Sequence, residues 1–192
     1  MRRFAVIGHL ARTDSGFTLE DMPGGAGRMD ILCRCVQSVL FLSHTIRRDT
    51  EVYLILLGPP SPPRTILFSG EKIRYLSPDE RSAGSLIRRA LSLPPSPYFI
   101  ESTPGVYIRS AGLDLLLHEH AFAIADEHGE DIRCADPLPL AYLLSDHLDF
   151  TPEEGAILDP LPRYSVGPLP LHADHAITLI HNELDRRGAG WP

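Results

Sequence analysis

The sequence of 192 residues has little cysteine and lysine: three cysteines, Cys33, Cys35 and Cys134, and one lysine, Lys72. So few cysteines, in an odd number, are typical of reduced thiols in a cytosol and imply no disulfide framework. Cys33 and Cys35 are two positions apart in a segment with helical periodicity, so we expect buried small residues rather than a metal pair. The other 17 basic residues are arginines, which suit bidentate phosphate contacts but also follow from genomic base composition.

Long hydrophobic runs are absent as well. The longest, such as residues 52–57, are far too short to cross a bilayer, and residues 1–8 lack the pattern of a signal peptide. We therefore expect a cytoplasmic protein that makes no membrane contact. With 43% hydrophobic residues, a chain of this length is expected to form one domain, residues 1–192.

The formal net charge of −7 argues at first against a nucleic-acid partner, because phosphate binding needs a positive surface. The charge is unevenly distributed along the chain. Residues 1–109 hold 14 basic and 10 acidic side chains, whereas residues 110–192 hold 4 basic and 15 acidic ones. Residues 1–109 therefore have a net charge of +4 and residues 110–192 one of −11. This distribution permits RNA binding by residues 1–109.

The order of apolar patterns predicts an α/β protein. Residues 3–9 and 52–57 are apolar runs typical of buried strands, and between them apolar side chains recur with helical spacing from Ile31 to Leu40. The same alternation continues along the chain. We expect a hairpin of residues 65–68 and 73–76, helices at 79–91, 113–119 and 173–188, a helical turn opening at Thr151, and strands at 98–101, 106–109, 122–125, 140–144 and 164–166.

Three turns that follow buried strands are candidate ligand-binding segments, because ligands collect at the carboxyl ends of strands in α/β sheets. They are residues 58–60, 144–147 and 165–169, the last of which leads into residues 172–175, His-Ala-Asp-His. None contains a GxGxxG, GxxxxGKS/T or GxSxG motif. The usual support for dinucleotide binding, a P-loop or an α/β-hydrolase nucleophile is therefore missing.

Seven of the nine histidines lie in residues 110–192. Asp146, His147, His172 and His175 are residue types that bind metals. However, His172 and His175 at a helix start also suit capping, and no third ligand follows at a diagnostic interval. We expect no metal site and keep a metal-dependent hydrolase as an alternative.

The segment before the first long helix admits two interpretations. In one, Arg28, Asp30 and Arg34 form a capping network in which Asp30 favours the positive end of the helix dipole. In the other, the glycines at positions 24, 25 and 27 let the backbone approach a ligand closely, and Arg28 and Arg34 hold phosphate. The spacing favours neither.

Several long strings resemble one family, the tRNA (pseudouridine(54)-N1)-methyltransferases of the SPOUT superfamily. They are residues 25–35, 41–44, 56–60, 75–81, 102–107, 165–168, 171–175 and 181–186, and the resemblance covers nearly the whole chain. It implies a homodimer that methylates N1 of pseudouridine 54 in the T-arm of tRNA, with no DNA partner. It also implies a mostly parallel sheet with helices on both faces and a deep C-terminal trefoil knot at about residues 140–187.

The resemblance further implies that S-adenosylmethionine binds among three loops of the knot. Carried over to this sequence, the cofactor residues are Leu143, Leu144, Ser145, Gly167, Leu169, Leu171 and Ala176. The family usually has glycine at position 145 and cysteine at position 176. Ser145 adds a Cβ where glycine allows a positive φ or a close approach to the ligand, so these departures bear on cofactor affinity.

Position and resemblance together suggest roles for the charged residues. The candidate catalytic residues are Asp146, Arg28 and Asp30. We hypothesise that Asp146, at the end of a knot strand, assists as a base or orients N1–H, and that Asp30 orients an arginine. The residues assigned to the RNA backbone are Arg28, Arg34, Arg47 and Arg48. The alternatives are the hydrolase named above and a non-catalytic SPOUT-like RNA-binding dimer that has lost cofactor affinity through Ser145.

Overall fold

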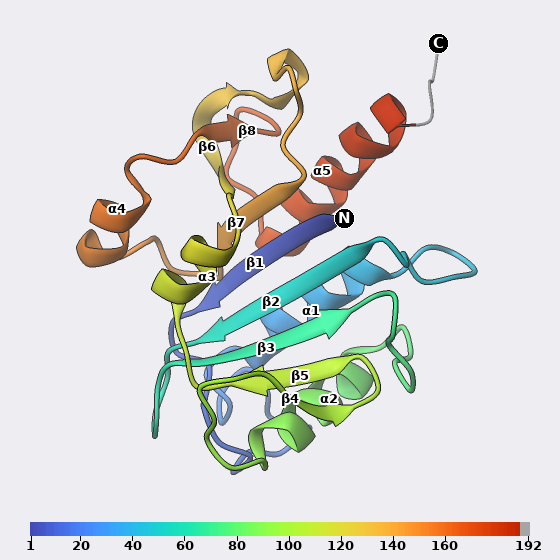
Figure 1. Cartoon of the computed structure of the whole chain (residues 1–192), viewed down its shortest axis with the longest axis vertical. Coiled ribbons are helices and arrows are strands. Elements are labelled where there is room, and N and C mark those ends of the chain that lie inside the picture. The colour runs from blue at the N-terminus through green and yellow to red at the C-terminus, as the bar shows by residue number, and fades with distance from the viewer. Residues whose placement is uncertain (189–192) are drawn as a thin grey trace.

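A computed structural model describes residues 1–188 (Figure 1). The strands are β1 Arg2–Gly8, β2 Thr50–Leu56, β3 Arg64–Ser69, β4 Ile100–Thr103, β5 Val106–Arg109, β6 Ala123–Asp131, β7 Ala141–Ser145 and β8 Arg163–Ser165. The helices are α1 Met29–Leu40, α2 Glu80–Leu91, α3 Leu113–Glu119, α4 Pro152–Leu158 and α5 Ala173–Gly188, with a short 3₁₀ helix, η1, at Ile132–Cys134. Strands and helices alternate along most of the chain, as the sequence predicts.

The eight strands form one sheet in the order β4-β5-β3-β2-β1-β7-β6-β8. β1 pairs in parallel with β2 and β7, and β6 pairs in parallel with β7 and β8. Beyond β2, the strands β3, β5 and β4 continue the sheet in antiparallel pairs. The predicted α/β class with a mostly parallel sheet is confirmed, and an antiparallel extension is added to it.

Helices cover both faces of the sheet. Along β1, Phe4 and Val6 face a large core shared with α1, α2 and α5, whereas Ala5 and Ile7 face a smaller core with α3 and α4. This alternation is the two-residue period of a strand that is buried on both sides. The prediction of helices on both faces is confirmed. Cys33 and Cys35 are both buried in the large core, as expected.

Local signals set the helix starts. Asp79 caps α2 by accepting a hydrogen bond from the N–H of Ser82 at 2.8 Å. Thr151 and Glu154 form a capping box at α4, with Pro152 at the first helical position. α5 then packs along α1. This packing brings the first turn of α5 back to the edge where β7 and β8 end.

The expected hairpin of residues 65–68 and 73–76 is wrong. Residues 65–68 belong to β3, but the neighbour of this strand is β5, which begins at Val106. The stretch 73–76 is no strand, because the N–H of Ile73 donates to the carbonyl of Ser69 at 2.8 Å and closes a tight turn. The apolar pattern arises because Ile73 and Leu76 are buried at this turn, whereas Tyr75 between them is exposed.

β6 is longer than the predicted strand of residues 122–125. It runs to Asp131, and its pairing with β8 shifts register between Ala125 and Glu130. The second half is polar, so hydrophobic patterning gives no signal for it. The extension places Glu127 and His128 at the rim of the sheet.

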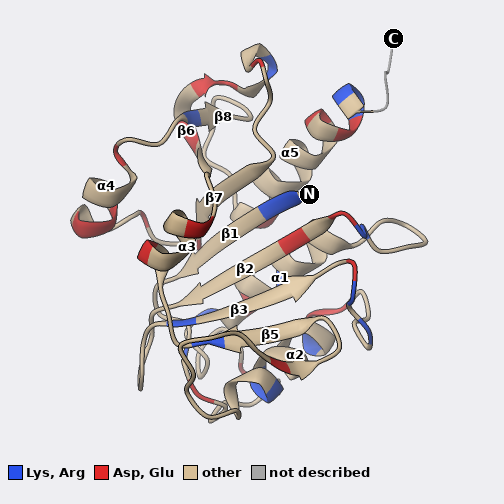
Figure 2. Ribbon diagram, viewed as in Figure 1, with Lys and Arg blue, Asp and Glu red and all other residues tan. Residues whose placement is uncertain are grey.

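Charged residues are distributed unevenly over the fold (Figure 2). Acidic residues colour parts of α3 and α4, whereas α2 carries the arginines Arg81, Arg88 and Arg89. This distribution follows the division of charge between residues 1–109 and 110–192. None of the helices within residues 1–188 is long and apolar enough to cross a membrane.

Gly27 provides a test of the crowded loop before α1. Its φ is +66°, and a Cβ there would overlap the carbonyl oxygen of Leu10. We expect Gly27→Ala to lower the free energy of unfolding by roughly 3 kcal/mol, measured by urea denaturation. Gly155→Ala is the matched control: a Cβ at this helical position meets nothing within 4 Å, so it should be neutral or stabilise by up to about 1 kcal/mol. Equal stability of the two variants would contradict the prediction.

Candidate functional site

A cavity of about 710 Å³ opens where β7, β6 and β8 approach α4 and the start of α5. It is lined by residues 125–128, 144–150, 155, 163–164, 166–167, 169–173 and 176. Two of the three predicted ligand-binding turns, 144–147 and 165–169, therefore meet in one place. The third, residues 58–60, does not line the cavity; the N–H of Gly58 instead donates to the carbonyl of Ala11 at 2.9 Å.

Most of the residues carried over as cofactor contacts are found in the cavity wall. Leu144, Ser145, Gly167, Leu169, Leu171 and Ala176 all line it. Leu143 does not, because it is fully buried on the opposite face of β7 in the smaller core. Leu143 therefore supports the wall from behind.

Ser145 occupies its position without an unusual backbone. It is the last residue of β7 and pairs with Ile7 of β1. Among the residues that the structure describes, Arg28 and Tyr75 are the non-glycine residues with positive φ. The Ser145 hydroxyl donates to the carbonyl of Leu148 and closes the turn after the strand. The Cβ that distinguishes serine from glycine thus causes no backbone strain here.

His9 bridges two buried carboxylates beside the cavity. Its Nδ1 lies 2.9 Å from Oδ1 of Asp146, and its Nε2 lies 3.0 Å from Oε2 of Glu154. The backbone N–H of His9 also donates to Oδ2 of Asp146, at 3.0 Å, and that of Leu148 donates to Oδ1 at the same distance. The side chain of Asp146 is 1% exposed. Its oxygens are therefore already occupied by donors from the protein.

These contacts favour the protonated, cationic form of His9. Burial by itself lowers the pKa of His9, but the hydrogen bonds and charges of Asp146 and Glu154 together raise it above its ordinary value. Because carboxylates only accept hydrogen bonds, both ring N–H groups donate. The imidazolium thus joins the ends of β1 and β7 to α4. Sequence reasoning missed His9 and Glu154, although His9 directly follows a buried strand and Glu154 completes a capping box.

His147 is the histidine of this group that reaches the cavity. Its side chain is 23% exposed, it lines the cavity, and its Nδ1 lies 3.3 Å from Oδ2 of Asp146. An acid next to Nδ1 orients an imidazole and leaves Nε2 for another partner, which is the arrangement of a carboxylate–histidine pair. The geometry therefore places Asp146 where it can orient the ring of His147, and His147 is the residue of the pair that reaches the cavity.

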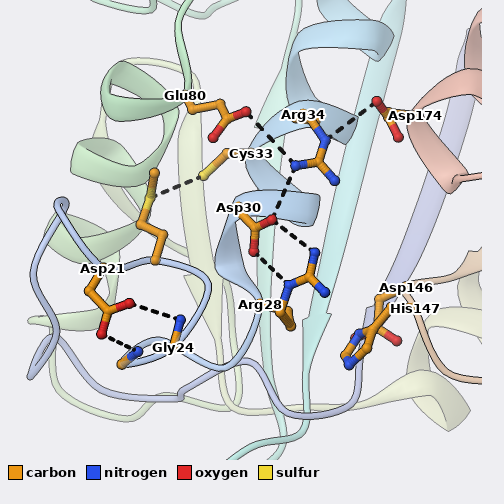
Figure 3. A network of polar contacts seen from close by, with 12 residues as sticks. Asp21, Gly24, Arg28, Asp30, Cys33, Arg34, Glu80, Asp146, His147 and Asp174 are labelled. Atoms are coloured by element: carbon orange, nitrogen blue, oxygen red, sulfur yellow. Dashed lines mark hydrogen bonds and ion pairs between the residues drawn. The ribbon is translucent and has the colours of Figure 1, made fainter.

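A chain of ion pairs connects α1 to the first turn of α5 (Figure 3). Arg28 donates to both oxygens of Asp30 at 3.0 and 3.1 Å, Arg34 donates to the same carboxylate at 3.1 Å, and Nε of Arg34 lies 3.5 Å from Asp174. Burial raises the pKa of Asp30, but the bonds from Arg28 and Arg34 lower it overall. Asp174 follows Ala173, a cavity residue. The arginines are thus paired, yet each keeps about a third of its side chain exposed, 36% for Arg28 and 32% for Arg34.

Arg28 also lies near the Asp146 group. Its hydrogen bond with Asp30 raises the pKa of Arg28, and the charge of Asp146 adds to this effect. Figure 3 shows Arg28 between Asp30 and the loop of Asp146 and His147. Of the two interpretations of this segment, the ion-pair network describes the internal contacts, and the exposed guanidinium surface is compatible with a phosphate contact as well.

Arg47 and Arg48, also predicted to bind RNA, make internal contacts. Arg47 donates to both oxygens of Asp185 at 2.9 and 2.5 Å and is 12% exposed. Arg48 donates to the carbonyl of Gly70 at 2.9 Å. The structure thus places both guanidinium groups in contacts that hold the 40–50 loop, and does not bring them to the cavity.

The four residues considered as metal ligands divide into two groups. Asp146 is bonded to His9, with His147 beside it, whereas the rings of His172 and His175 stand edge to face with centroids 5.8 Å apart. Within residues 1–188, no three or more His, Cys, Asp or Glu side chains are grouped to hold a metal ion. The contacts therefore give no geometric support to the hydrolase alternative.

Comparison with known proteins decides the family. Residues 1–189 match the model of a family of SAM-dependent RNA methyltransferases. The chain is 57% identical to the tRNA (pseudouridine(54)-N(1))-methyltransferase of Methanocorpusculum labreanum over 98% of each chain, and 51% identical to that of Methanospirillum hungatei over 100% of each. The chain belongs to this methyltransferase family. The resemblance noted from the sequence is confirmed.

A solved structure supports the fold of this family member. The crystal structure of Archaeoglobus fulgidus Nep1 bound to S-adenosylhomocysteine matches 98% of each chain with a TM-score of 0.68. At 17% sequence identity, this likeness concerns the fold alone.

The cavity of this methyltransferase fits S-adenosylmethionine in size and chemistry. Its volume of about 710 Å³ lies within the usual range of cofactor sites. Apolar side chains, including Leu144, Leu169 and Leu171, offer surface for an adenosyl group, and Glu127 and Asp149 offer negative charge to a sulfonium. The residues that line the cavity therefore suit this cofactor in apolar surface and charge.

The His9 bridge makes the stability of this methyltransferase depend on pH. His9→Ala leaves two buried carboxylates without their cation, so we expect a loss of about 3 kcal/mol in the free energy of unfolding at pH 6. Because the folded pKa of His9 is raised above the unfolded value of 6.5, this stabilisation is complete below pH 6.5 and is lost as the pH rises through the folded pKa.

Urea denaturation of wild type and His9→Ala between pH 5.5 and pH 9 checks this prediction. The difference between the two proteins in free energy of unfolding should become smaller as the pH rises. His44→Ala, in an exposed loop, is the matched control and should change stability little. A difference that stays constant over this range would show that the His9 contribution is not ionic.

Proposed function

We propose that this chain transfers a methyl group from S-adenosylmethionine to N1 of pseudouridine 54 in the T-arm of tRNA. The support is the identity of 51–57% to relatives named for this reaction over essentially their whole length. The segments that line the cavity lie within the matched region. The structure adds a cavity with suitable size and charge at the carboxyl edge of the parallel strands.

The chemistry sets three demands on the protein. Pseudouridine carries a proton on N1, whereas N1 of uridine is bonded to the ribose. Methylation forms an N1–C bond, breaks a C–S bond and releases the N1 proton. The protein must therefore hold N1 in line with the methyl group, accept the proton and hold the RNA.

The cavity residues are proposed to hold the cofactor. Bound S-adenosylmethionine supplies an electrophilic methyl group on a sulfonium. The turn of residues 144–146, the segment 167–171 and Ala176 surround the cavity. Ser165 and Gly167 fix the second of these segments, since the Ser165 hydroxyl donates to the carbonyl of Gly167 at 2.7 Å and accepts from its N–H at 3.1 Å.

The proton of N1 is proposed to leave through the Asp146–His147 pair. Asp146 is almost fully buried and its oxygens are occupied, so it acts as a positioning residue. His147 lines the cavity and accepts the proton on Nε2. The charged groups around this pair are His9 and Glu154 behind Asp146 and Arg28 on the side of α1. A cationic Arg28 there attracts the RNA backbone.

Arg28 and Arg34 are proposed to hold RNA phosphates, with Asp30 fixing the orientation of Arg28. Both side chains are about a third exposed; Arg28 lies toward the turn of Asp146 and His147, and Arg34 lies beside Asp174 at the start of α5. Arg47 and Arg48 stay predictions as RNA contacts. The hydrogen bonds of Arg47 favour a structural role, whereas Arg48 bonds to backbone carbonyls but is exposed.

The assembly is also a proposal. We expect residues 1–192 to act as one domain, knotted at about residues 140–187, in a cytoplasmic homodimer with no membrane or DNA partner. Exposed leucines on and before α5, Leu171 at 44% and Leu179 at 42%, support contact with a second copy. The mass of the protein in solution, measured by light scattering, checks the dimer.

The substrate is tested with two tRNA transcripts that differ only in the base at position 54. With S-adenosylmethionine, mass spectrometry should find one added methyl on the pseudouridine-54 tRNA and none on the uridine-54 tRNA, because uridine has no free N1. A protein that binds no S-adenosylmethionine in calorimetric titration would instead be the non-catalytic dimer. A methyl group found on another nucleotide would correct the substrate.

The proton acceptor is tested by single-turnover methylation at several pH values. His147→Gln should lower the rate by about 10²-fold or more at each pH, because glutamine cannot accept the N1 proton. Asp146→Asn should cause part of this loss, and the exposed control His44→Gln none. A wild-type rate in His147→Gln together with an inactive Asp146→Asn would assign the acceptor role to Asp146 itself.

A further inference from the structure

A second, smaller pocket lies at the other end of the sheet. Its volume is about 260 Å³, and it is lined by Tyr75, Ser82, Ser85, Leu86, Arg89 and Thr103. Thr103 belongs to β4, the first strand in the order of the sheet, whereas the cofactor cavity lies at β7, β6 and β8. Five strand spacings separate β4 from β7, a distance of about 24 Å. The pocket is therefore separate from the site of methyl transfer.

Thr103 gives this pocket an unused hydrogen-bonding group. The residue is 8% exposed, and its hydroxyl oxygen is buried with no hydrogen-bond partner in the part of the chain that the structure describes. A buried polar group without a partner is costly, and such groups are rare in folded proteins. Thr103 lines the pocket, so a rotation of its side chain about χ1 would turn the hydroxyl toward a ligand that supplies the missing partner.

Tyr75 gives the same pocket an exposed aromatic surface. It is 76% exposed, and its φ of 63° is a left-handed conformation that a bulky residue rarely adopts. The hydroxyl of Ser82 on α2 accepts from the N–H of Ser77 at 2.8 Å, and Gln37 of α1 donates to the carbonyl of Ser77 at 3.2 Å. Two helices thus hold the turn that presents Tyr75. Strain kept in place by its surroundings, on an exposed aromatic, is typical of a binding position.

Arg89 adds a positive charge. It lies with Arg88 in the last turn of α2, is exposed, and has no ion-pair partner among residues 1–188. An aromatic face, hydroxyl groups and an arginine together are the groups that recognise an unstacked nucleotide: the base stacks on the ring, its edge bonds to hydroxyls and the phosphate pairs with the guanidinium. The volume suits one base rather than a whole cofactor.

We propose that this pocket binds one unstacked nucleotide of the RNA substrate, with the base on Tyr75, its polar edge on Thr103 and a phosphate on Arg89. The inference rests on the proposed function for the presence of RNA. A polymer accounts for the occupant better than a free nucleotide, because a tRNA held at the cofactor cavity extends far enough to reach a pocket about 24 Å away. Two strings that carry the family resemblance and have no role in methyl transfer, residues 75–81 and 102–107, meet at this pocket.

Binding of tRNA to the full-length protein, followed by fluorescence anisotropy, tests the proposal. Tyr75→Ala should raise the Kd for tRNA about fivefold or more, the effect of losing one stacked base. Tyr98→Ala is the matched control: Tyr98 is 80% exposed and lies outside the pocket, so its removal should leave the Kd unchanged. Calorimetry should give wild-type affinity for S-adenosylmethionine in both variants, which shows that the fold is intact.

Thr103→Val and Arg89→Ala separate binding from structure. Thr103→Val keeps the shape and removes an unpaired hydroxyl, so the thermal unfolding temperature should not fall while the Kd for tRNA rises. Arg89→Ala should reduce the slope of log Kd against log salt concentration by about one, the mark of a lost phosphate contact, and Tyr75→Ala should not.

Three outcomes overturn the proposal. Tyr75→Ala and Tyr98→Ala with the same Kd would exclude stacking in the pocket, and Thr103→Val with a lower unfolding temperature and an unchanged Kd would make Thr103 structural. Binding of uridine monophosphate that depends on Tyr75 while tRNA binding does not would assign the pocket to free nucleotides. Failure of the wild type to bind or methylate tRNA would contradict the proposed function instead.

Discussion

The candidate site depends on one imidazolium, that of His9, held between two buried carboxylates. Its contacts with Asp146 and Glu154 join the ends of β1 and β7 to α4, three elements that meet at the carboxyl edge of the sheet. Without that cation the two acids would be buried close together, which is strongly unfavourable. The same group fixes Asp146, and Asp146 positions His147. One electrostatic contact therefore supports both the cavity wall and the proposed proton acceptor.

Ion pairing also changes the meaning of the charge distribution. The first 109 residues carry a net +4, but several of their arginines are paired within the protein: Arg47 with Asp185, Arg109 with Glu119, and Arg28 with Asp30. The first two pairs join residues 1–109 to residues 110–192. They therefore hold the two parts of the chain together and also neutralise charge. Whether an arginine is available to bind RNA depends on how exposed its side chain is, and the net charge gives no information about exposure. Exposed arginines on α2 and the partly exposed Arg28 and Arg34 meet that condition.

The sequence predicts the parallel half of the fold better than the antiparallel half. The periodicity of apolar residues predicts buried strands such as β2 and the apolar stripe of α1. The turns that begin at residues 144 and 165 are predicted because ligands bind at the carboxyl ends of parallel strands. The strand predicted at residues 73–76 is wrong, because apolar residues buried at a turn cannot be told by sequence from apolar residues buried in a short strand. The His9 bridge is missed for another reason: its partners are 137 and 145 positions away. Periodicity is local, and only the pairing of β1 with β7 brings these residues together.

The two ends of the sheet answer two different requirements of a site-specific RNA methyltransferase. A cavity that fits one cofactor and one reacting base can test whether the base carries a proton on N1, but every pseudouridine passes that test. Choosing one position in an RNA needs contacts with neighbouring nucleotides, because base identity and backbone shape around the target carry the remaining information. The parallel strands form the reaction cavity, and the antiparallel strands β3, β5 and β4 extend the same rigid sheet away from it. The proposed contact on β4 and the proposed reaction at β7 are thereby held at a fixed separation, and a fixed separation is what allows a protein to measure position along an RNA.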